Sequence, residues 1–232
     1  MIEETLFEML GSWIAGLASA GRRRRTRRGW EKKWGSPDFK RPWLRRGVSQ
    51  EVVTAVEEGW FAPGATAIDL GCGEGDVAAW LAGRGFTVLG VDIAAAAIER
   101  ARARCDAGSA RLTFEVHDIC AGPPPGGPFQ ALVDRGCFHQ IASRDRPIYR
   151  RNVLKVATPD ARLLLFHKAF RKGEPLGDSH ERRRVTTLVE EGLGGAFSIE
   201  KYAETFLDPC HGSDPESALP GLVFWMRRRT EG

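Results

Sequence analysis

An apolar strand that runs directly into a glycine-rich turn is the feature that most constrains the fold of this chain. Residues 67–75 read Ala-Ile-Asp-Leu-Gly-Cys-Gly-Glu-Gly, and a second apolar run ends at Asp92, seventeen residues after Gly75. Glycine tolerates positive φ and carries no β-carbon, so a ligand can come close to such a turn and to the N-terminus of the next helix. A carboxylate that closes the second strand can accept hydrogen bonds from both hydroxyls of a ribose. The pattern therefore predicts a nucleoside-type ligand at one edge of a parallel sheet.

The spacing of the glycines distinguishes this turn from the dinucleotide-binding turn. The NAD form requires a Gly or Ala three residues after the second glycine, where this chain has Asp76. The last glycine instead comes one position earlier, and an additional acid, Asp69, precedes the turn. These differences favour an adenosine cofactor other than NAD. The glycine spacing is the one feature that argues against a dehydrogenase.

Strand and helix patterns alternate along the chain beyond the turn. Alternation of this kind predicts an α/β fold with a doubly wound, mostly parallel seven-stranded sheet and helices on both faces. The last two strands, separated by turn residues over 208–220, are expected to form an antiparallel pair at the sheet edge. Strands are predicted at 66–70, 86–92, 111–116, 129–134, 161–167, 197–206 and 222–229, and helices at 49–58, 75–83, 94–104, 145–157 and 185–191.

Three elements at successive strand ends resemble the class I S-adenosylmethionine (SAM) dependent methyltransferases. They are the turn 69–75, Asp92, and His117-Asp118-Ile119 after the third strand. The resemblance implies a Rossmann-like fold with SAM as the cofactor: Asp69 receives the ammonium of its methionine part, Asp92 holds the ribose, and Asp118 accepts the adenine amino group. The cofactor-binding set that follows is Trp34, Asp69, Gly71, Cys72, Gly73, Gly75, Asp92, Ile93, Asp118, Ile119 and Asp134.

The fourth predicted strand ends at the same edge, in a segment that begins Asp134-Arg135 and contains His139. Methyl transfer from a sulfonium is an in-line displacement, so the protein mainly aligns the nucleophile and excludes water. His139 is the candidate general base because an unperturbed imidazole titrates near neutral pH, and a partly buried structural histidine is the alternative. Arg135 either binds an anionic substrate group or pairs with Asp134 or Asp145. The predicted catalytic residues are His139, Asp134 and Arg135.

Tryptophans before the glycine turn narrow the resemblance to one branch of these methyltransferases. Trp30-x-x-x-Trp34 followed by Pro42-Trp43 is similar to the thiopurine, thiol and halide methyltransferase branch, in which the N-terminal segment folds over the cofactor as a lid. The resemblance implies an apolar pocket suited to a soft nucleophile such as a thiolate, whereas tryptophans at i and i+4 also mark the core face of a helix. His167 and Lys168, which end the fifth strand, are expected to face the same cleft. The predicted substrate-binding residues are Trp30, Trp43, His139 and His167.

Length and cysteine usage limit the organisation of the protein. A chain of 232 residues with 42% hydrophobic residues suits one α/β domain with an extension. We expect an N-terminal helix, basic run and aromatic lid over residues 1–48 and a SAM-binding domain over 49–232. The five cysteines form no close Cys-x-x-Cys pair, so reduced thiols, no metal site and a cytoplasmic location are expected.

The segment before the lid combines an apolar stretch with a basic run. Residues 6–20 have helical apolar spacing, but acids precede the stretch and it is shorter than the roughly 20 residues that a membrane span requires. Six of the seven residues from Arg22 to Arg28 are arginine. One interpretation is an amphipathic helix that packs on the domain, followed by a solvated basic turn. The other is weak contact with an anionic membrane surface through residues 5–28.

These patterns predict a SAM-dependent methyltransferase that modifies a heteroatom of a small molecule, sulfur before oxygen or nitrogen, in a xenobiotic or natural product. A monomer or homodimer is expected. A nucleic-acid methyltransferase is suggested by the arginine run, but the segment after Asp134 lacks the Asn/Asp-Pro-Pro-aromatic motif common in enzymes that methylate base amino groups. A non-catalytic SAM- or nucleotide-binding regulatory module is disfavoured because the cofactor set is complete.

Overall fold

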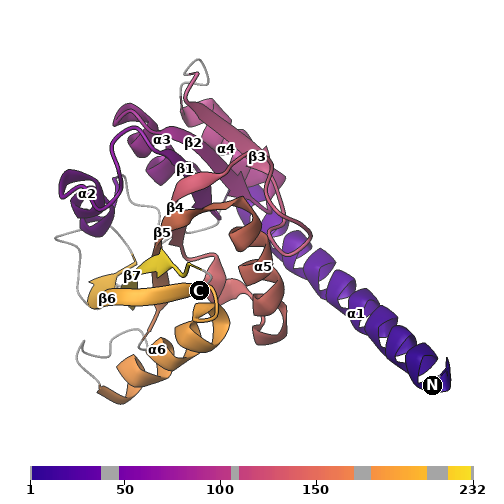
Figure 1. Cartoon of the computed structure of the whole chain (residues 1–232). Coiled ribbons are helices and arrows are strands. Elements are labelled where there is room, and N and C mark those ends of the chain that lie inside the picture. The colour runs from indigo at the N-terminus through magenta and orange to yellow at the C-terminus, as the bar shows by residue number, and fades with distance from the viewer. Residues whose placement is uncertain (1, 38–46, 106–109, 170–178, 208–218, 231–232) are drawn as a thin grey trace.

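A seven-stranded sheet with the order β3-β2-β1-β4-β5-β7-β6 forms the centre of the molecule (Figure 1). The structure is a computed structural model that describes residues 2–37, 47–105, 110–169, 179–207 and 219–230, with side chains from residue 19 onward. The strands are β1 (Thr66–Leu70), β2 (Thr87–Asp92), β3 (Leu112–Val116), β4 (Phe129–Arg135), β5 (Ala157–Lys168), β6 (Phe197–Phe206) and β7 (Pro220–Arg228).

The first five strands are parallel, and their carboxyl ends meet at one edge of the sheet. Leu70 is in register with Val91 on β2 and with Asp134 on β4, so the glycine turn leaves the sheet between these two strands. The strand order reverses there, and β1 is followed by β2 and β3 on one side and by β4 and β5 on the other. Strand β7 is antiparallel to both β5 and β6, which confirms the predicted antiparallel edge pair.

Helices cover both faces of the sheet, as the alternating pattern predicts. One core joins α2, α3 and α4 to the first face, and a second core joins α5 and α6 to the other. The central strand β1 is buried on both sides, because Ala67 packs into the first core and Ile68 into the second. The helices are α2 (Gln50–Glu57), α3 (Asp76–Gly83), α4 (Ala95–Arg104), α5 (Arg146–Val156) and α6 (Ser179–Leu193), and the 3₁₀ turns η1 (Phe138–Gln140) and η2 (Ser143–Asp145) connect β4 to α5.

Helix α1 (Ile2–Gly35) is a single helix of 34 residues, so the prediction of a short helix followed by a basic turn is wrong. Arginine is a good helix former, and the basic run contains no proline to end the helix. The C-terminal part of α1 lies beside α4, and its first turns extend beyond the rest of the molecule (Figure 1). Among the described helices, α1 included, none combines the length and apolar composition needed to cross a bilayer.

Two other elements are longer than the sequence pattern indicates. Helix α6 begins at Ser179 rather than at Val185, because its buried face of Val185, Val189 and Leu193 is preceded by polar turns that carry no apolar periodicity. Strand β5 begins at Ala157, directly after α5, and its first residues are separated from the regular pairing with β4 by a register shift.

Candidate active site

A cavity of about 610 Å³ lies at the carboxyl ends of the parallel strands. The ends of β1, β2 and β3 line one side, the segment after β4 and the end of β5 line another, and α1 contributes Trp30, Trp34 and basic side chains. Twelve predicted site residues line it: Trp30, Trp34, Asp69, Gly71, Cys72, Gly73, Asp92, Ile93, Asp118, Ile119, Arg135 and His139.

The glycine turn brings backbone to the cavity wall where side chains would not fit. Gly71 has φ +73°, and a β-carbon there would lie 2.7 Å from the β-carbon of Cys137. Gly73 has φ +55°, and a β-carbon there would lie 3.2 Å from the ring of Trp34. The Gly71 and Cys72 amides both donate to the Val91 carbonyl, at 2.8 and 2.9 Å, which fixes the turn against β2. The glycines therefore let both the segment after β4 and α1 close onto the turn.

Asp92 ends β2 with a carboxylate that is already held in place. Its Oδ2 accepts from the Gly73 amide at 3.0 Å, and its Oδ1 accepts from the Ala94 amide at 2.9 Å. Burial raises the pKa of Asp92, and the amides of Ala94 and Gly73 oppose that rise. A carboxylate offers about four lone-pair positions, so each oxygen retains capacity for one more donor. The geometry is suited to a diol.

Asp69 is almost fully buried, with 2% of its surface exposed, and it lines the cavity. Its Oδ2 has no hydrogen-bond partner among the described residues. Burial raises the pKa of Asp69 to about 7, and the charge of Asp134 contributes in the same direction. A buried polar atom without a partner costs about 1–3 kcal/mol, so this oxygen favours a ligand that supplies a donor, and a cation most of all.

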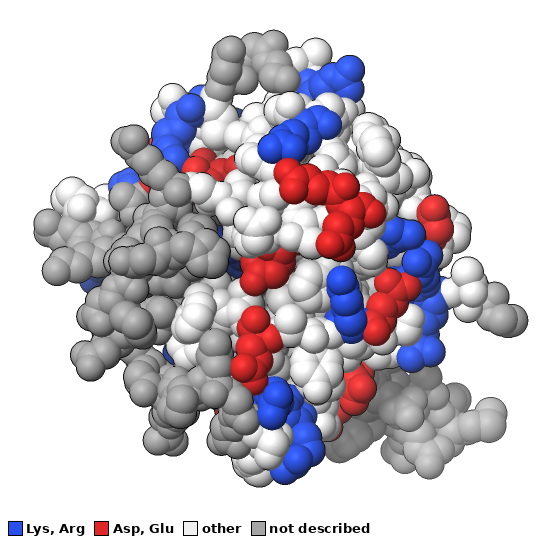
Figure 2. Space-filling model, turned by 90° about the vertical axis from the view of Figure 1, so that its left-hand side faces the viewer, with Lys and Arg blue, Asp and Glu red and all other residues white. Residues whose placement is uncertain are grey.

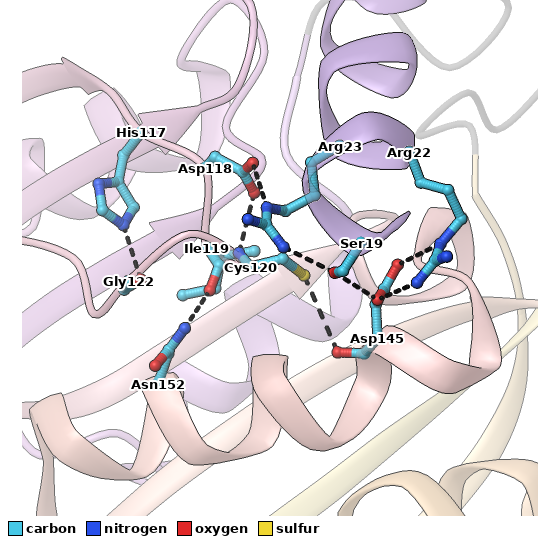
Figure 3. A network of polar contacts seen from close by, with 10 residues as sticks. All are labelled: Ser19, Arg22, Arg23, His117, Asp118, Ile119, Cys120, Gly122, Asp145 and Asn152. Atoms are coloured by element: carbon cyan, nitrogen blue, oxygen red, sulfur yellow. Dashed lines mark hydrogen bonds and ion pairs between the residues drawn. The ribbon is translucent and has the colours of Figure 1, made fainter. Parts of the chain in front are cut away.

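The loop after β3 presents Asp118 and Ile119 to the cavity (Figure 3). Asp118 Oδ1 accepts from the Cys120 amide at 2.9 Å, which forms a tight turn. The Ile119 carbonyl accepts from Asn152 of α5 at 2.7 Å, so the loop is anchored from the opposite side. These contacts position one carboxylate and one apolar side chain at the far end of the cavity.

Helix α1 is tied to this loop and to η2, just before α5, by a set of contacts that we call the clasp, formed by Ser19, Arg22, Arg23, Asp118 and Asp145 (Figure 3). Ser19 Oγ and Arg22 Nη2 donate to Asp145 Oδ1 at 3.0 and 3.1 Å. Arg23 donates to Ser19 at 2.7 Å and lies 3.7 Å from Asp118. Burial alone would raise the pKa of Asp145, but the hydrogen bonds from Arg22 and Ser19 hold it below its ordinary value.

The C-terminal end of α1 is held by different contacts. Glu31 accepts hydrogen bonds from the amides of Ala95 and Ala96 at 2.8 and 3.2 Å, and so caps the N-terminus of α4 from a distant part of the chain. Trp34 is buried against Gly73 and the first turn of α4. Trp34 is thus both a core residue and part of the cavity wall, which combines the two interpretations of the tryptophan spacing.

On the side of β4 and β5 the cavity is lined by Arg135, His139 and Lys168. Arg135 donates to the Leu207 carbonyl, and its positive charge acts to lower the pKa of Asp69. The Lys168 amide donates to His139 Nδ1 at 3.4 Å. Burial, and then the positive charge of Lys168, lower the pKa of His139 to about 4, so its imidazole is neutral and a weak base at neutral pH. This argues against the predicted general-base role.

Asp134 does not face the cavity, which corrects its predicted catalytic and cofactor-binding roles. It is fully buried and accepts hydrogen bonds from the amides of Gly136, Cys137 and Phe138 and from the Tyr149 hydroxyl. Burial raises its pKa to about 6 against these hydrogen bonds. The carboxylate therefore fixes the conformation of the segment after β4, and it is not among the residues that line the cavity.

Two other predicted residues also lie elsewhere. His167 is buried away from the cavity, beside the rings of Phe138 and His139, because successive residues of β5 point to opposite faces and Lys168 takes the cavity side. Gly75 lies behind the cavity wall, where a β-carbon would lie 2.5 Å from the Phe114 ring. Trp43 is outside the described residues.

Sequence reasoning missed Ser19 and Glu31 as parts of this site, and named Asp145 only as an alternative partner of Arg135. The basic run indicated charge, but the pattern alone did not distinguish the inward Arg22 and Arg23 from their exposed neighbours. Ser19 and Arg22 lie 126 and 123 residues before their partner Asp145 in the sequence. Such pairings leave no local signal, and only the arrangement of α1 against the sheet reveals them.

The charges elsewhere on the molecule do not form a continuous basic surface on the face that carries α2 and β6. Figure 2 shows acidic and basic side chains next to one another on that face. Ion pairs there include Arg84 with Glu57 at 3.7 Å and Arg227 with Glu200 at 2.5 Å. This face is of mixed sign and is not suited to a nucleic-acid backbone.

Residues 67–160 match a protein family described as a methyltransferase domain. The 2-heptyl-1-hydroxyquinolin-4(1H)-one methyltransferase of Mycobacteroides abscessus is 32% identical over 131 residues, which are 55% of this chain and 57% of that protein. An uncharacterized methyltransferase of Schizosaccharomyces pombe is 29% identical over 98 residues, 42% of this chain and 68% of its own. The matched region thus spans little more than half of the first relative.

Solved structures show the same fold. The N-methyltransferase NodS of Bradyrhizobium japonicum, in complex with S-adenosyl-L-homocysteine, superposes with a TM-score of 0.62 at 16% identity, covering 89% of this chain and 99% of NodS. A structure described for the conversion of a disulfide bond into a thioacetal group during echinomycin biosynthesis gives a TM-score of 0.67 at 22% identity, covering 84% and 87%. The chain has the Rossmann-like SAM methyltransferase fold, and structures with this fold are described with bound SAM or S-adenosyl-L-homocysteine.

Proposed function

We propose that this protein transfers the methyl group of SAM to a heteroatom of a small molecule. The observation that carries the proposal is the arrangement of Asp69, Asp92 and Asp118 at the ends of three successive strands around one cavity. The unpartnered oxygen of Asp69 supports it further, because the methionine ammonium of SAM supplies the missing donor. The methyltransferase match over residues 67–160 covers all three carboxylates.

Each residue of the cofactor side has a role in this proposal. Asp69 binds the ammonium, and Asp92 uses the free capacity of its oxygens for the ribose hydroxyls. Asp118 accepts from the adenine amino group, and Ile119 packs on the ring. When bound, SAM supplies an electrophilic methyl group on a sulfonium, and the protein orients it and excludes water.

Residues 1–48 act as a lid in the same proposal. Trp30 and Trp34 both line the cavity from α1, which is held by the clasp near its middle and against α4 near its C-terminus. An aromatic roof lowers the local dielectric, and this strengthens the attraction between a charged acceptor and the sulfonium. The lid therefore has a chemical as well as a steric purpose.

The acceptor is a xenobiotic or natural product of small size, and sulfur leads oxygen and nitrogen as the methylated atom. The name of the M. abscessus relative specifies a hydroxylated quinolinone, which supports a heteroaromatic acceptor. The cavity volume of about 610 Å³ suits the cofactor together with a compact acceptor. The protein works as a monomer or homodimer in the cytoplasm in this proposal.

Calorimetric titration with SAM, S-adenosylhomocysteine and NAD tests the cofactor. We expect micromolar binding of both adenosyl ligands and none of NAD. Asp92→Ala should weaken SAM binding by about 1–3 kcal/mol, because buried hydrogen bonds to the ribose are lost. Asp160→Ala, at an exposed acid outside the cavity, is the matched control and should leave binding unchanged. A folded protein that binds neither adenosyl ligand would contradict the proposal.

A further inference from the structure

The side chains at the strand ends change from negative to positive charge across the point where the strand order reverses. Asp69, Asp92 and Asp118 stand at or just after the ends of β1, β2 and β3. Arg135 and Lys168 end β4 and β5, on the other side of β1. The strand ends therefore give the cavity an acidic side and a basic side that meet at the glycine turn, and Arg22, Arg23 and Arg25 of α1 also line the cavity.

Of the two cations at the strand ends, Lys168 is the better placed to meet a second ligand. It lines the cavity, its side chain is exposed, and within the described residues it forms no ion pair. It lies close enough to His139 for its charge to act on that imidazole. Arg135, the other cation of this side, is anchored through the Leu207 carbonyl, so its position is fixed while Lys168 can adapt.

The basic side has no described group suited to remove a proton at neutral pH. Burial raises the pKa of the Cys137 thiol well above its ordinary value, so this group stays protonated. Asp145 is engaged by Ser19 and Arg22 in the clasp. His139 accepts from the Lys168 amide through Nδ1, which leaves the proton of the neutral ring on Nε2. An acceptor that must lose a proton on the enzyme finds no base here.

We infer that the methyl acceptor binds as an anion, an ionised thiol or an acidic hydroxyl, with its negative charge facing Lys168 and Arg135. A lone pair of the anion forms the bond to the methyl carbon. The carbon–sulfur bond that breaks leaves its electron pair on sulfur, so the products are a neutral methylated acceptor and a neutral thioether, and no proton moves. This inference rests on the proposed methyl transfer and specifies its substrate class.

Two matched probe pairs test the charge requirement. They are 4-nitrothiophenolate with 4-nitrothioanisole, and 4-nitrophenolate with 4-nitroanisole; each pair shares a ring and differs in the methyl group and the charge. Affinities are measured by calorimetry on the full chain saturated with S-adenosylhomocysteine. At least one anion should bind about tenfold tighter than its neutral methyl ether, since a single close charge pair near a protein surface is worth a few kcal/mol at most.

Variants of Lys168 locate the effect. Lys168→Met should lower anion affinity about three- to tenfold and leave the affinity for the neutral ether and for S-adenosylhomocysteine unchanged. Lys168→Arg should restore most of the loss. Lys155→Met removes the same charge from an exposed position on α5 outside the cavity, and should change nothing.

The outcomes separate this inference from the proposed function. If the wild-type protein fails to bind S-adenosylhomocysteine, the cofactor proposal itself fails. Three results with a protein that does bind S-adenosylhomocysteine would overturn the anionic acceptor and leave the cofactor site standing. The neutral ethers could bind as tightly as the anions, or neither anion could bind. Alternatively, Lys168→Met could weaken the binding of both members of a pair equally.

Discussion

The two sides of the cavity hold their charges in different ways. On the acidic side, Asp92 is buried and its oxygens are oriented by the amides of Gly73 and Ala94. On the basic side, Lys168 is exposed at the end of a flexible stem, and only its backbone amide has a described partner in the site. The cofactor side is thus organised before any ligand arrives, whereas the acceptor side can adapt to ligands of different shape. This division suits an enzyme with one cofactor and a range of acceptors.

Burial acts on both sides but with opposite consequences for titration. It raises the pKa of Asp69 to about 7 and lowers the pKa of His139 to about 4. In each case burial disfavours the charged form. The acid becomes a group that charges fully only above neutral pH, and the imidazole becomes one that stays neutral down to acidic pH. The two sides should therefore respond to pH in opposite directions.

The largest effect is expected at Asp69. Its folded-state pKa lies above its unfolded value, so the folded protein binds more protons between about pH 4 and 7 and loses stability as the pH rises through this window. Asn at this position cannot titrate. Asp69→Asn should therefore raise the free energy of unfolding of the unliganded protein by about 2–4 kcal/mol at pH 8 and by little near pH 4. Urea unfolding at both pH values measures the difference.

The same substitution should weaken SAM binding by about 1–3 kcal/mol, because the ammonium loses its carboxylate. A more stable protein that binds its cofactor less well is the expected combination. Glu99→Gln, at an exposed acid of α4 outside the cavity, serves as the control and should show neither effect. An Asp69→Asn protein that is destabilised equally at pH 4 and pH 8 would refute the assignment of a buried carboxylate whose Oδ2 has no partner among the described residues.

A smaller effect of opposite sign is expected at His139. Its folded-state pKa is depressed, so its contribution to stability is present above pH 6.5 and is lost as the pH falls towards 4. When the pH falls from 7 to 4.5, the free energy of unfolding of His139→Gln should decrease by about 1–3 kcal/mol less than that of the wild type. Urea unfolding at the two pH values provides the measurement. A second readout is the pH profile of kcat/KM, and an acid limb near pH 6.5 that disappears in the variant would restore the general-base role.

The acidic side could be predicted from the sequence because its determinants are local. The glycine turn directly follows β1, Asp92 ends β2 and Asp118 lies two residues after β3, and parallel strands bring their carboxyl ends to one edge. The seven-stranded sheet and its antiparallel edge pair followed from the same alternation. Asp134 was misassigned because a strand end is also where a carboxylate can turn inward and organise the next loop, and the sequence contains no signal for that choice.

The basic side and the lid were harder to predict because their geometry depends on distant partners. Glu31 caps a helix 64 residues further along the chain, and Arg22 reaches Asp145 across 123 residues. The alternation along β5 directs Lys168 to the cavity and His167 away from it, and an error of one residue in the register reverses that choice.

The smallest expected effect concerns the clasp, which joins α1 to the acidic loop. The Arg22 side chain is 27% exposed, so its pair with Asp145 is partly screened by solvent, and Arg22→Gln should lower the free energy of unfolding by only about 0.5–1 kcal/mol. Local opening of α1 should respond more clearly, with faster amide hydrogen exchange over residues 19–35 and a difference that shrinks as salt is added. Arg24→Gln removes the same charge from an exposed neighbour and should leave exchange unchanged. If both variants exchange alike, the clasp does not hold the lid, and Glu31 and Trp34 would have to fix α1 from its other end.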